Sequence, residues 1–267
     1  MPLELYHLHL SQSERIVWLL EEMQVPYELK VFYRDPVTAL GPPELKAISP
    51  AGTAPCLHDT NVSPPVILSE STAIAAYLLA VYGGDSSSRS PTSAEAVSST
   101  PSAPPPPPRM NRAPGDADYA AYLEWFHFAN GTLQASMFRQ MSVALTVLST
   151  AGAEANSNAA VQRGHARLER ELRLVDAQLG RTGAWLAGPD LSAADCMAVF
   201  SLTTMRGFLP VDLAPYPHVL GYLGRVAARP AYRRALDRGD GAMEPMVGEV
   251  VRRFTEFEGL RGALEKL

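Results

Sequence analysis

The sequence predicts an α/β domain followed by an all-helical domain, and three observations support this division. Strand and helix patterns follow one another as βαβαββα up to about residue 84. A stretch rich in serine, proline and alanine comes next, and from Asp118 onward only helical patterns occur. We therefore expect an α/β domain at 1–84, a linker at 85–117, a helical domain at 118–240 and a charged, amphipathic helical tail at 241–267.

The elements of the first half are predicted from hydrophobic periodicity and from the residues that flank each run. Apolar residues alternate with His and Tyr in the first run, which indicates a strand. Two prolines begin the second helical run, where they suit a first helical turn. The predicted order is a strand at 3–10, a helix at 15–25, a strand at 27–32, a short helix at 42–48, short strands at 54–57 and 66–68, and a helix at 72–82.

The second half reads as a series of helices. Residues 118–148 predict one long helix, or two with a break near Gly131. An amphipathic helix follows and ends at Gly180. Ser192 and Asp195 have the spacing of a capping box, with Asp in place of the usual Glu, and they precede a run of small and apolar residues. Two further short helices are predicted at 216–228 and 230–238.

Composition restricts the class of protein. The formal net charge is -5 and the pI is about 5.7, which gives no electrostatic footprint for nucleic acid. No apolar run approaches the roughly 20 residues that span a bilayer, and residues 1–10 lack the pattern of a secretory signal. The 2 cysteines, Cys56 and Cys196, lie far apart in apolar context, which is typical of a reducing compartment. These features predict a cytoplasmic protein that acts on small molecules.

The linker at 85–117 is nearly free of large apolar residues, so we expect it to be disordered with extended polyproline character. Its run of five prolines can dock in an aromatic groove of a partner protein. Composition alone favours the simpler interpretation, a tolerated spacer.

Residues 53–71 form the stretch with the clearest chemistry. A strand, a proline-rich turn and a second strand lead into Glu70-Ser71, where a helix begins. The start of a helix offers unpaired backbone N–H groups and the positive end of the helix dipole, so it can hold a carboxylate. The neighbouring Glu70 can hold an ammonium group. The stretch therefore predicts a site for a ligand that carries both groups.

This stretch resembles the second half of the glutathione-binding domain of cytosolic glutathione S-transferases. In that family a cis-proline turn pairs with the backbone of glutathione, and an acidic residue with a serine binds the γ-glutamyl end. SQSERIVWLLEE at 11–22 and PPELKAISPAGTAP at 42–55 are most similar to the serine-using bacterial and fungal members, of theta-like type. The resemblance implies a thioredoxin-like N-terminal domain, an all-α C-terminal domain and a homodimer.

The resemblance implies that Ser11 is the catalytic residue. In the serine-using branches the catalytic serine lies four residues before the arginine that opens the first helix, as Ser11 does before Arg15. A hydroxyl that donates to sulfur favours the thiolate over a free thiol, whose pKa is about 8.5. His9 stands where the tyrosine-using classes place their donor. The alternative role for Ser11 is a helix cap, for which Ser13 is better placed.

The same resemblance assigns glutathione binding to five residues: Thr53, Ala54, Pro55, Glu70 and Ser71. It implies a cis bond before Pro55, so that the following strand presents backbone groups to the peptide ligand. Thr53 departs from the basic residue that many relatives carry there. The alternative interpretation of Glu70 and Ser71 is a plain helix N-terminus.

Other candidates carry weaker signals. Cys56 is interpreted as an inert buried residue rather than a redox group. His7 and His9 lie on one face of the predicted strand and His58 is a further candidate, but nothing marks the third ligand and open geometry that a metal site needs, so no metal is predicted. The aromatic stripe on the helix after Asp118 is typical of a core. The resemblance adds an acceptor pocket, for which the candidates are His9, Leu10, Tyr119, Tyr122 and Phe126.

The sequence therefore predicts a glutathione S-transferase that joins glutathione, its co-substrate, to an electrophilic and largely apolar small molecule. Two alternatives stay open. The same thiolate can reduce a peroxide, isomerise a double bond or add sulfur in a biosynthetic pathway. The chain can also be a non-catalytic scaffold that uses the linker as its partner site, an interpretation favoured by Thr53 and opposed by the intact Ser11 and Glu70-Ser71.

Overall fold

The computed structural model describes residues 3–49, 51–83, 107–151 and 158–259. Its N-terminal domain has the predicted order of elements. They are β1 (Leu3–Leu8), α1 (Glu14–Met23), β2 (Tyr27–Phe32), α2 (Glu44–Ile48), β3 (Cys56–Asp59), β4 (Val66–Ser69) and α3 (Ser71–Tyr82).

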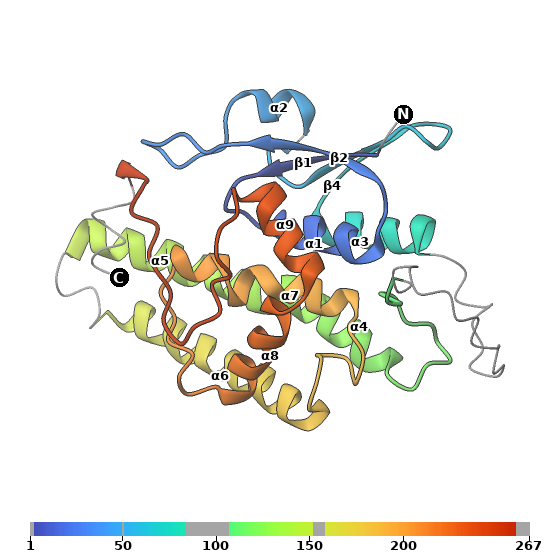
Figure 1. The fold of residues 1–267 in the computed structure, drawn as a ribbon. Helices are drawn as coiled ribbons and strands as arrows, with labels where there is room; N and C mark the ends of the chain where they lie inside the picture. Colours follow the sequence, from blue (N-terminus) through green and yellow to red (C-terminus); the bar gives the residue numbers. More distant parts are fainter. Residues whose placement is uncertain (1–2, 50, 84–106, 152–157, 260–267) are drawn as a thin grey trace.

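The strands form one mixed sheet in the order β2-β1-β3-β4. β1 runs parallel to β2 and antiparallel to β3, so Leu5 lies opposite both Leu29 and Leu57. Helix α2 covers one face of the sheet, while α1 and α3 lie on the other face, toward the helical domain (Figure 1). This is the thioredoxin-like arrangement, and the prediction is confirmed.

The C-terminal domain is helical, as predicted. It consists of α4 (Tyr119–Phe128), a π-helical turn η1 (Ala129–Gln134), α5 (Ala135–Ala151), α6 (Ala159–Thr182), α7 (Ala193–Leu202), a 3-10 turn η3 (Thr204–Gly207), α8 (Pro217–Ala227) and α9 (Pro230–Gly239). Every residue of α7 is buried, and Ser192 and Asp195 form the predicted capping box at its start. Within the described residues, no helix is long and apolar enough to cross a membrane.

The expected break near Gly131 is a π-helical turn rather than a gap. η1 continues directly from α4 into α5. A π turn inserts one extra residue into the helix and is frequent at functional sites. Here it carries Asn130 and Gln134, which both accept hydrogen bonds from Arg15.

Part of the predicted linker is packed against the helical domain. Of residues 85–117, those at 85–106 lie outside the described residues, while 107–117 form contacts. Met110 is buried, and its carbonyl accepts a hydrogen bond from Ala193 N–H (2.8 Å). Arg112 pairs with Asp118 and donates to the carbonyl of Asp190. The helical domain therefore begins before Asp118, because Met110 and Arg112 attach this segment to it. The composition of the segment does not indicate these contacts.

The C-terminal tail is not the predicted helix. Residues 241–257 are irregular, and 260–267 lie outside the described residues. We call residues 241–259 the C-terminal strap. Several of its backbone groups bond to other segments: the buried Arg206 donates to the carbonyls of Gly248 and Glu249, and Phe254 N–H donates to Gly207 C=O at 3.0 Å.

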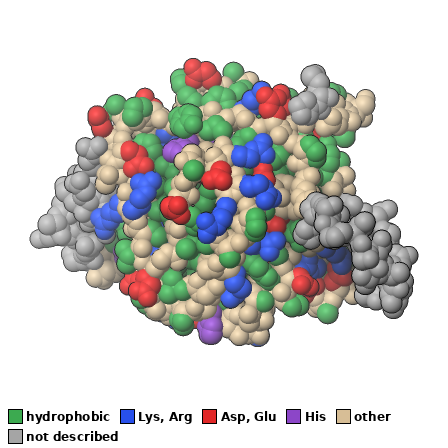
Figure 2. Space-filling view, in the orientation of Figure 1, with side chains coloured by type: hydrophobic (Ala, Val, Ile, Leu, Met, Phe, Trp, Pro, Cys, Tyr) green, Lys and Arg blue, Asp and Glu red, His purple; other side chains and the backbone are tan. Residues whose placement is uncertain are grey.

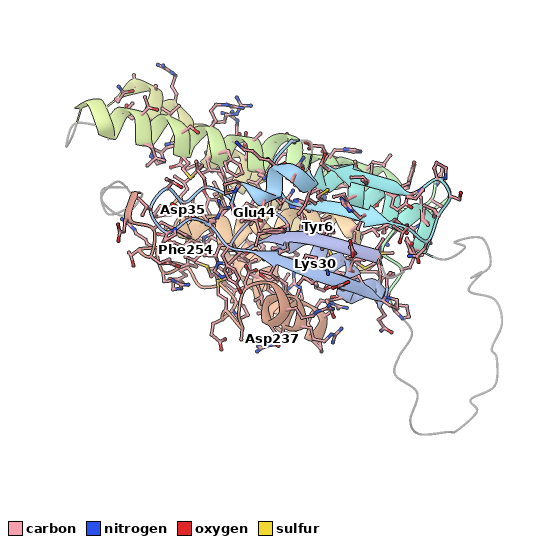
Figure 3. The ribbon with its side chains drawn as sticks, turned by 90° about the horizontal axis from the view of Figure 1, so that it is seen from above. Tyr6, Lys30, Asp35, Glu44, Asp237 and Phe254 are labelled. Carbon is pink, nitrogen blue, oxygen red and sulfur yellow. The ribbon has the colours of Figure 1, made fainter. Side chains whose placement is uncertain are left out.

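The strap also joins the two domains. N–H groups of Glu258 and Gly259 donate to the carbonyls of Pro36 (2.9 Å) and Val37 (2.7 Å), in the loop between β2 and α2. Seen from above, the labelled Phe254 lies near Asp35 of that loop (Figure 3). The strap therefore runs over the end of the sheet where β1 gives way to α1.

A second contact between the domains is made by α1 and α9. Arginines of α9 and of the loop before it pair with acids of α1, as Arg229 does with Glu22 and Arg234 with Glu21 (2.8 Å). Basic and acidic side chains are accordingly interspersed on this face of the molecule (Figure 2). Tyr232 packs edge-on against Trp18, with 5.1 Å between ring centroids. These contacts fix α1 against α9.

Candidate active site

Ser11 lies in the turn between β1 and α1, at the position expected of a thiol-activating hydroxyl. Leu10 before it has a φ of 53°, a left-handed conformation that turns the chain away from the strand. Ser11 is buried, and its Oγ lies 2.7 Å from Oγ of Ser13. Ser13 is not the predicted side-chain cap of α1: its hydroxyl makes no capping bond and lies 2.7 Å from Nδ1 of His7 instead.

Arg15 is a fully buried cation at the start of α1. It donates to Asn130 Oδ1 (2.8 Å), Gln134 Oε1 (2.5 Å) and Ser71 Oγ (3.3 Å). Burial lowers the pKa of Arg15 to about 9, and the charge of Glu14 partly opposes this shift. Among the described residues no carboxylate forms a salt bridge with Arg15, and its Nε has no hydrogen-bond partner. A positive charge held without a counter-ion favours an anion nearby.

Two glutamine side chains extend this network to the proline turn. Gln134 Nε2 donates to Gln12 Oε1 (2.5 Å), and Gln12 Nε2 donates to the carbonyl of Ala54 (3.2 Å). With Arg15 and Ser71, they form one path of hydrogen bonds between the turn before β3 and the start of α3. The path includes Gln12, the neighbour of Ser11. Three stretches that are distant in sequence are thus held in one place.

The residues proposed for glutathione binding have distinct geometries. The peptide bond between Ala54 and Pro55 is cis, as expected. Thr53 and Glu70 are exposed, whereas Ser71 is buried at the first position of α3. Glu70 has a φ of 73°, a backbone conformation that non-glycine residues rarely adopt and that is often found at functional sites.

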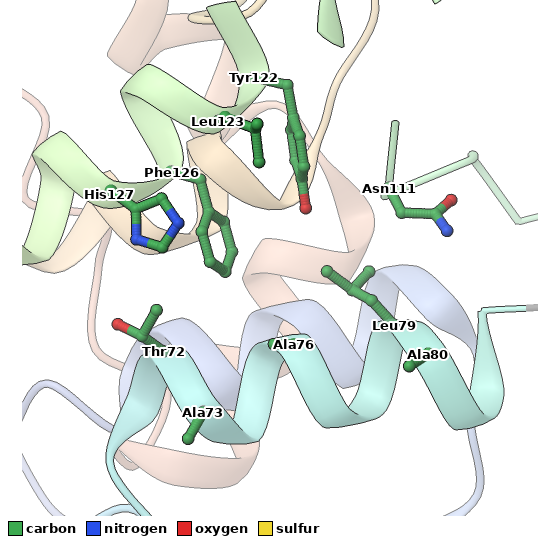
Figure 4. Close-up of a pocket in the computed structure, with 10 residues that line it drawn as sticks. All are labelled: Thr72, Ala73, Ala76, Leu79, Ala80, Asn111, Tyr122, Leu123, Phe126 and His127. Carbon is green, nitrogen blue, oxygen red and sulfur yellow. The ribbon is translucent and has the colours of Figure 1, made fainter. Parts of the chain in front are cut away.

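The candidates for the acceptor pocket fall into separate places. Leu10 belongs to a buried apolar cluster, with Ala39, Phe208, Met246, Phe254 and Phe257. His9 is half-buried against Tyr33, and burial lowers its pKa. Tyr122 and Phe126 instead line a groove between α3 and α4 (Figure 4). Tyr119 is half-buried and packs against the main core.

Sequence reasoning missed the polar residues that connect these positions. Gln12, Asn130 and Gln134 lie in stretches of helical or capping character, and nothing local marks them as parts of one site. No local signal marks Phe208 or Phe254 either. Asn130 and Gln134 reach the site on the π turn and Phe254 on the strap, and the packing of these segments depends on tertiary contacts.

The remaining candidates are structural. Cys56 is fully buried, and burial raises the pKa of its thiol, in agreement with an inert role. Burial also raises the pKa of Cys196. His58 packs against Tyr6, with 4.6 Å between ring centroids. Within the described residues, no three His, Cys, Asp or Glu side chains are grouped to hold a metal ion.

The fold and this site define a two-domain protein of the thioredoxin-like plus helical class, with a polar site between the domains. Comparison with family models agrees. The description "Glutathione S-transferase, N-terminal domain" matches residues 11–80, and "Glutathione S-transferase, C-terminal domain" matches residues 138–230. The chain belongs to the glutathione S-transferase family.

Individual relatives support the assignment. Glutathione S-transferase 3 of Schizosaccharomyces pombe is 28% identical over 246 residues, which cover 88% of this chain and 86% of that protein. A glutathione S-transferase structure from Actinobacillus pleuropneumoniae is 29% identical with a TM-score of 0.68, covering 90% of this chain and 95% of that one. A family member from Pseudomonas fluorescens, solved with two glutathione bound, shares the fold at 22% identity and a TM-score of 0.63, covering 88% and 92%.

Proposed function

We propose that this chain is an enzyme that binds glutathione and conjugates its thiolate to an electrophilic, largely apolar small molecule. The observation that carries the proposal is the hydrogen-bond path from the Ala54 carbonyl to the Ser71 hydroxyl, which passes through the loop that carries Ser11. It holds together the three stretches that glutathione would contact. The known relatives that bind glutathione support the same ligand.

Each end of glutathione has a complementary group in this site. The α-carboxylate of the γ-glutamyl end fits the start of α3, where Ser71 offers a hydroxyl and Arg15 a positive charge. Glu70 is placed to accept from the ammonium group. The cysteinyl backbone would pair with the strand after Pro55. Gln12 already donates to the Ala54 carbonyl, and that oxygen has a second lone pair for the ligand.

Ser11 is the proposed catalytic residue, through contact of its hydroxyl with the glutathione sulfur. A free thiol has a pKa of about 8.5, so little of it is thiolate at neutral pH. A hydroxyl that donates to the thiolate, at the N-terminal end of α1, favours the charged form. The work of the protein is then positioning and charge stabilisation.

The second substrate would lie against the apolar cluster that begins at Leu10, the neighbour of Ser11. Phe208 and Phe254 pack there with 4.7 Å between their ring centroids, beside Met246. Aromatic and thioether groups suit an apolar ligand, and because these side chains are buried within and beneath the strap, the ligand would reach them by displacing part of it. The acceptor is therefore expected to be apolar, with its electrophilic atom turned toward Ser11.

We further propose a homodimer, as the family resemblance implies, in which a second copy covers the groove between α3 and α4. The groove has a volume of about 560 Å³, and Leu123 and Phe126 are among its lining residues (Figure 4). Apolar side chains are exposed on and near these helices: Val81 by 47%, Ile67 by 57% and Leu123 by 37%. A charge at this surface would oppose pairing, so Leu123→Glu is expected to give a monomer in light scattering. Leu174→Glu, at a 52% exposed position on α6, is the control and is expected to stay dimeric.

The first test is the ultraviolet difference spectrum of bound glutathione against pH. The bound thiol of the wild type is expected to have a pKa well below 8.5, and Ser11→Ala should return it toward that value. Ser142→Ala, at an exposed serine of α5, should leave it unchanged. A normal pKa in all three proteins would exclude Ser11 as the activating group. Failure to bind glutathione would favour the scaffold alternative.

The reaction itself is decided by turnover. Conjugation with an apolar aryl halide that is lost in Ser11→Ala supports the proposed transferase activity. Faster turnover of an organic hydroperoxide, with oxidised glutathione as product, would favour the peroxidase alternative instead. The cysteine usage of the chain supports a cytoplasmic location, which fractionation of cells would test.

A further inference from the structure

A second path of buried polar groups starts at Ser11. It leads away from the path between Ala54 and Ser71, into the contact between the two domains. Ser13 Oγ lies 2.7 Å from Ser11 Oγ and 2.7 Å from His7 Nδ1. On the far side of the imidazole, His7 Nε2 lies 3.4 Å from Asp240 Oδ1. Each of the four side chains is buried, with at most 4% of its surface exposed. The path joins β1, the start of α1 and the residue that follows α9.

The geometry of this path is held by backbone groups. Leu10 N–H donates to Asp240 Oδ1 at 2.7 Å, which fixes the carboxylate behind the Ser11 turn. Leu8 N–H donates to Ser13 Oγ at 3.2 Å. A Cβ atom at Gly239 would lie only 3.0 Å from His7 Nε2, so the glycine leaves room for the imidazole. The ring therefore sits in a fitted slot between β1 and α9.

The donors and acceptors along the path follow from the charge of Asp240. Burial raises the pKa of Asp240, but its hydrogen bonds to His7 and to the N–H of Leu10 outweigh burial, and the pKa lies below the usual value. A carboxylate only accepts hydrogen bonds, so Nε2 of His7 is the donor toward Asp240, and in this tautomer Nδ1 is an acceptor. Ser13 then donates to Nδ1 at 2.7 Å, in preference to the Leu8 carbonyl at 3.4 Å.

With Ser13 donating to His7, Ser11 in turn donates to Ser13. A lone pair of Ser11 is then left to accept a proton from the bound thiol. We propose that Ser13 and His7 form a proton relay that carries the glutathione thiol proton away through Ser11 and stores it on His7, beside Asp240. This inference rests on the proposed function, because it requires the thiol to contact Ser11.

The relay conserves protons and electrons. The S–H bond of glutathione breaks and its electron pair stays on sulfur, while the proton bonds to Ser11 Oγ. Ser11 passes its own proton to Ser13, and Ser13 passes its proton to Nδ1 of His7. Both hydroxyl groups are regenerated, and the direction of each hydrogen bond along the path is reversed. The Ser11 O–H therefore now donates to the thiolate. The product is a thiolate and an imidazolium next to a carboxylate, with no proton released to solvent.

In this scheme Ser11 is the catalytic residue, and Ser13, His7 and Asp240 are positioning residues that act through it. Other titratable or charged groups come close to this part of the molecule. Their electrostatic interactions with Asp240, His7 or His9 place them around the relay, in the turn after β1, on α1, in the loop after β2, on α9 and on the strap. They are His9, Glu14, Arg34, Tyr232 and Glu256.

The experiment counts protons released for each thiolate formed when glutathione binds. Thiolate is read from its ultraviolet absorbance, and protons from an indicator dye in weak buffer near pH 7. S-methylglutathione has no thiol, so its binding measures the protons that the other groups release or take up. This number is subtracted. The relay predicts close to zero protons for each thiolate in the wild type. A value close to one would overturn it, while leaving Ser11 as a direct donor and the proposed function intact.

Two variants distinguish a relay that takes up the thiol proton from residues that only hold Ser11 in position. His7→Asn keeps an oxygen acceptor for Ser13 but accepts no proton, so the thiolate that forms should be accompanied by about one released proton and a higher thiol pKa. Ser13→Ala should act in the same way. If either variant keeps the wild-type proton count, the relay is wrong. If the wild type itself forms no thiolate, the proposed function fails and the relay with it. The wild-type count needs no variant, so a folding defect in His7→Asn leaves the inference testable.

Discussion

Glu14 of α1 accepts a hydrogen bond from the hydroxyl of Tyr232 of α9, with 2.6 Å between the two oxygens. Thr203 (3.2 Å) and Thr204 donate to the same carboxyl group, which is fully buried between the domains. Burial raises the pKa of Glu14 to about 7, and the charge of Asp240 adds to this effect, while the three hydrogen bonds partly oppose it. The contact between the domains therefore contains a group that titrates near neutral pH.

Glu14→Gln is expected to flatten the dependence of stability on pH. Glu14 changes from an ordinary pKa of 4.5 to about 7 on folding, so the folded state binds more protons between these values. Its contribution to the free energy of unfolding is then present below about pH 4.5 and is lost as pH rises through 7, by roughly 3 kcal/mol. Urea unfolding from pH 5 to 8 measures it. Glu124→Gln, at an exposed position on α4, should keep the wild-type slope, and an equal slope in Glu14→Gln would contradict the assignment.

Arg15→Lys is expected to weaken glutathione binding by about 10- to 100-fold. A lysine keeps the charge but loses the planar fork that donates to Asn130, Gln134 and Ser71 at once. The expected loss equals roughly one charge-assisted hydrogen bond, about 1.5–3 kcal/mol, because the ammonium group keeps the charge and part of the network. Calorimetric titration with glutathione measures the change. Arg139→Lys, at an exposed position on α5, is the matched control, and equal affinities in both variants would show that the Arg15 network does not organise the site.

Much of the fold could be predicted because its signals are local. The strand alternation at Leu3–Leu8 and the capping box at Ser192 each depend on a few neighbouring residues, and both agree with the structure. The cis bond before Pro55 was predicted only through the resemblance. Residue type and spacing alone would have favoured trans, because cis is uncommon at X–Pro bonds.

The features that sequence reasoning missed depend on distant partners. The sequence pattern predicts that Phe254 lies on an amphipathic helix, but its backbone N–H bonds to Gly207 and its ring packs on Phe208. Ser13 was expected to cap α1, yet His7 offers its hydroxyl an imidazole nitrogen that becomes available only when β1 lies beside α1. Asp240 carries no local signal at all. A periodic pattern predicts an element and its buried face, not which tertiary group will compete for its hydrogen bonds.

Neither cysteine is expected to react with thiol reagents in the folded protein. Cys56 and Cys196 are both fully buried, and burial raises the pKa of both thiols, so access and thiolate fraction are low together. An aromatic disulfide reagent should modify no thiol in native buffer and both in concentrated urea. Rapid reaction of one thiol in native buffer would indicate that its strand or helix opens locally, and peptide mapping would identify it.

Gly207→Ala is expected to release the C-terminal strap. A Cβ atom at Gly207 would lie 2.4 Å from the ring of Phe254, so the ring and the strap backbone that donates to Gly207 must move. Overpacking of this kind costs about 1–3 kcal/mol. Gly224→Ala on α8 meets no atom within 4 Å and should be neutral or stabilising by up to about 1 kcal/mol.

Thermal unfolding and limited digestion with trypsin measure the two effects of Gly207→Ala separately. The melting temperature should fall in Gly207→Ala and not in Gly224→Ala. Cleavage after Arg252 should be faster in Gly207→Ala alone, because its cation–π contact with Phe254, 4.9 Å from the ring centroid, is lost when the ring moves. If Gly207→Ala lowers the melting temperature without faster cleavage, the strap stays in place. The substitution then destabilises η3 rather than releasing the strap.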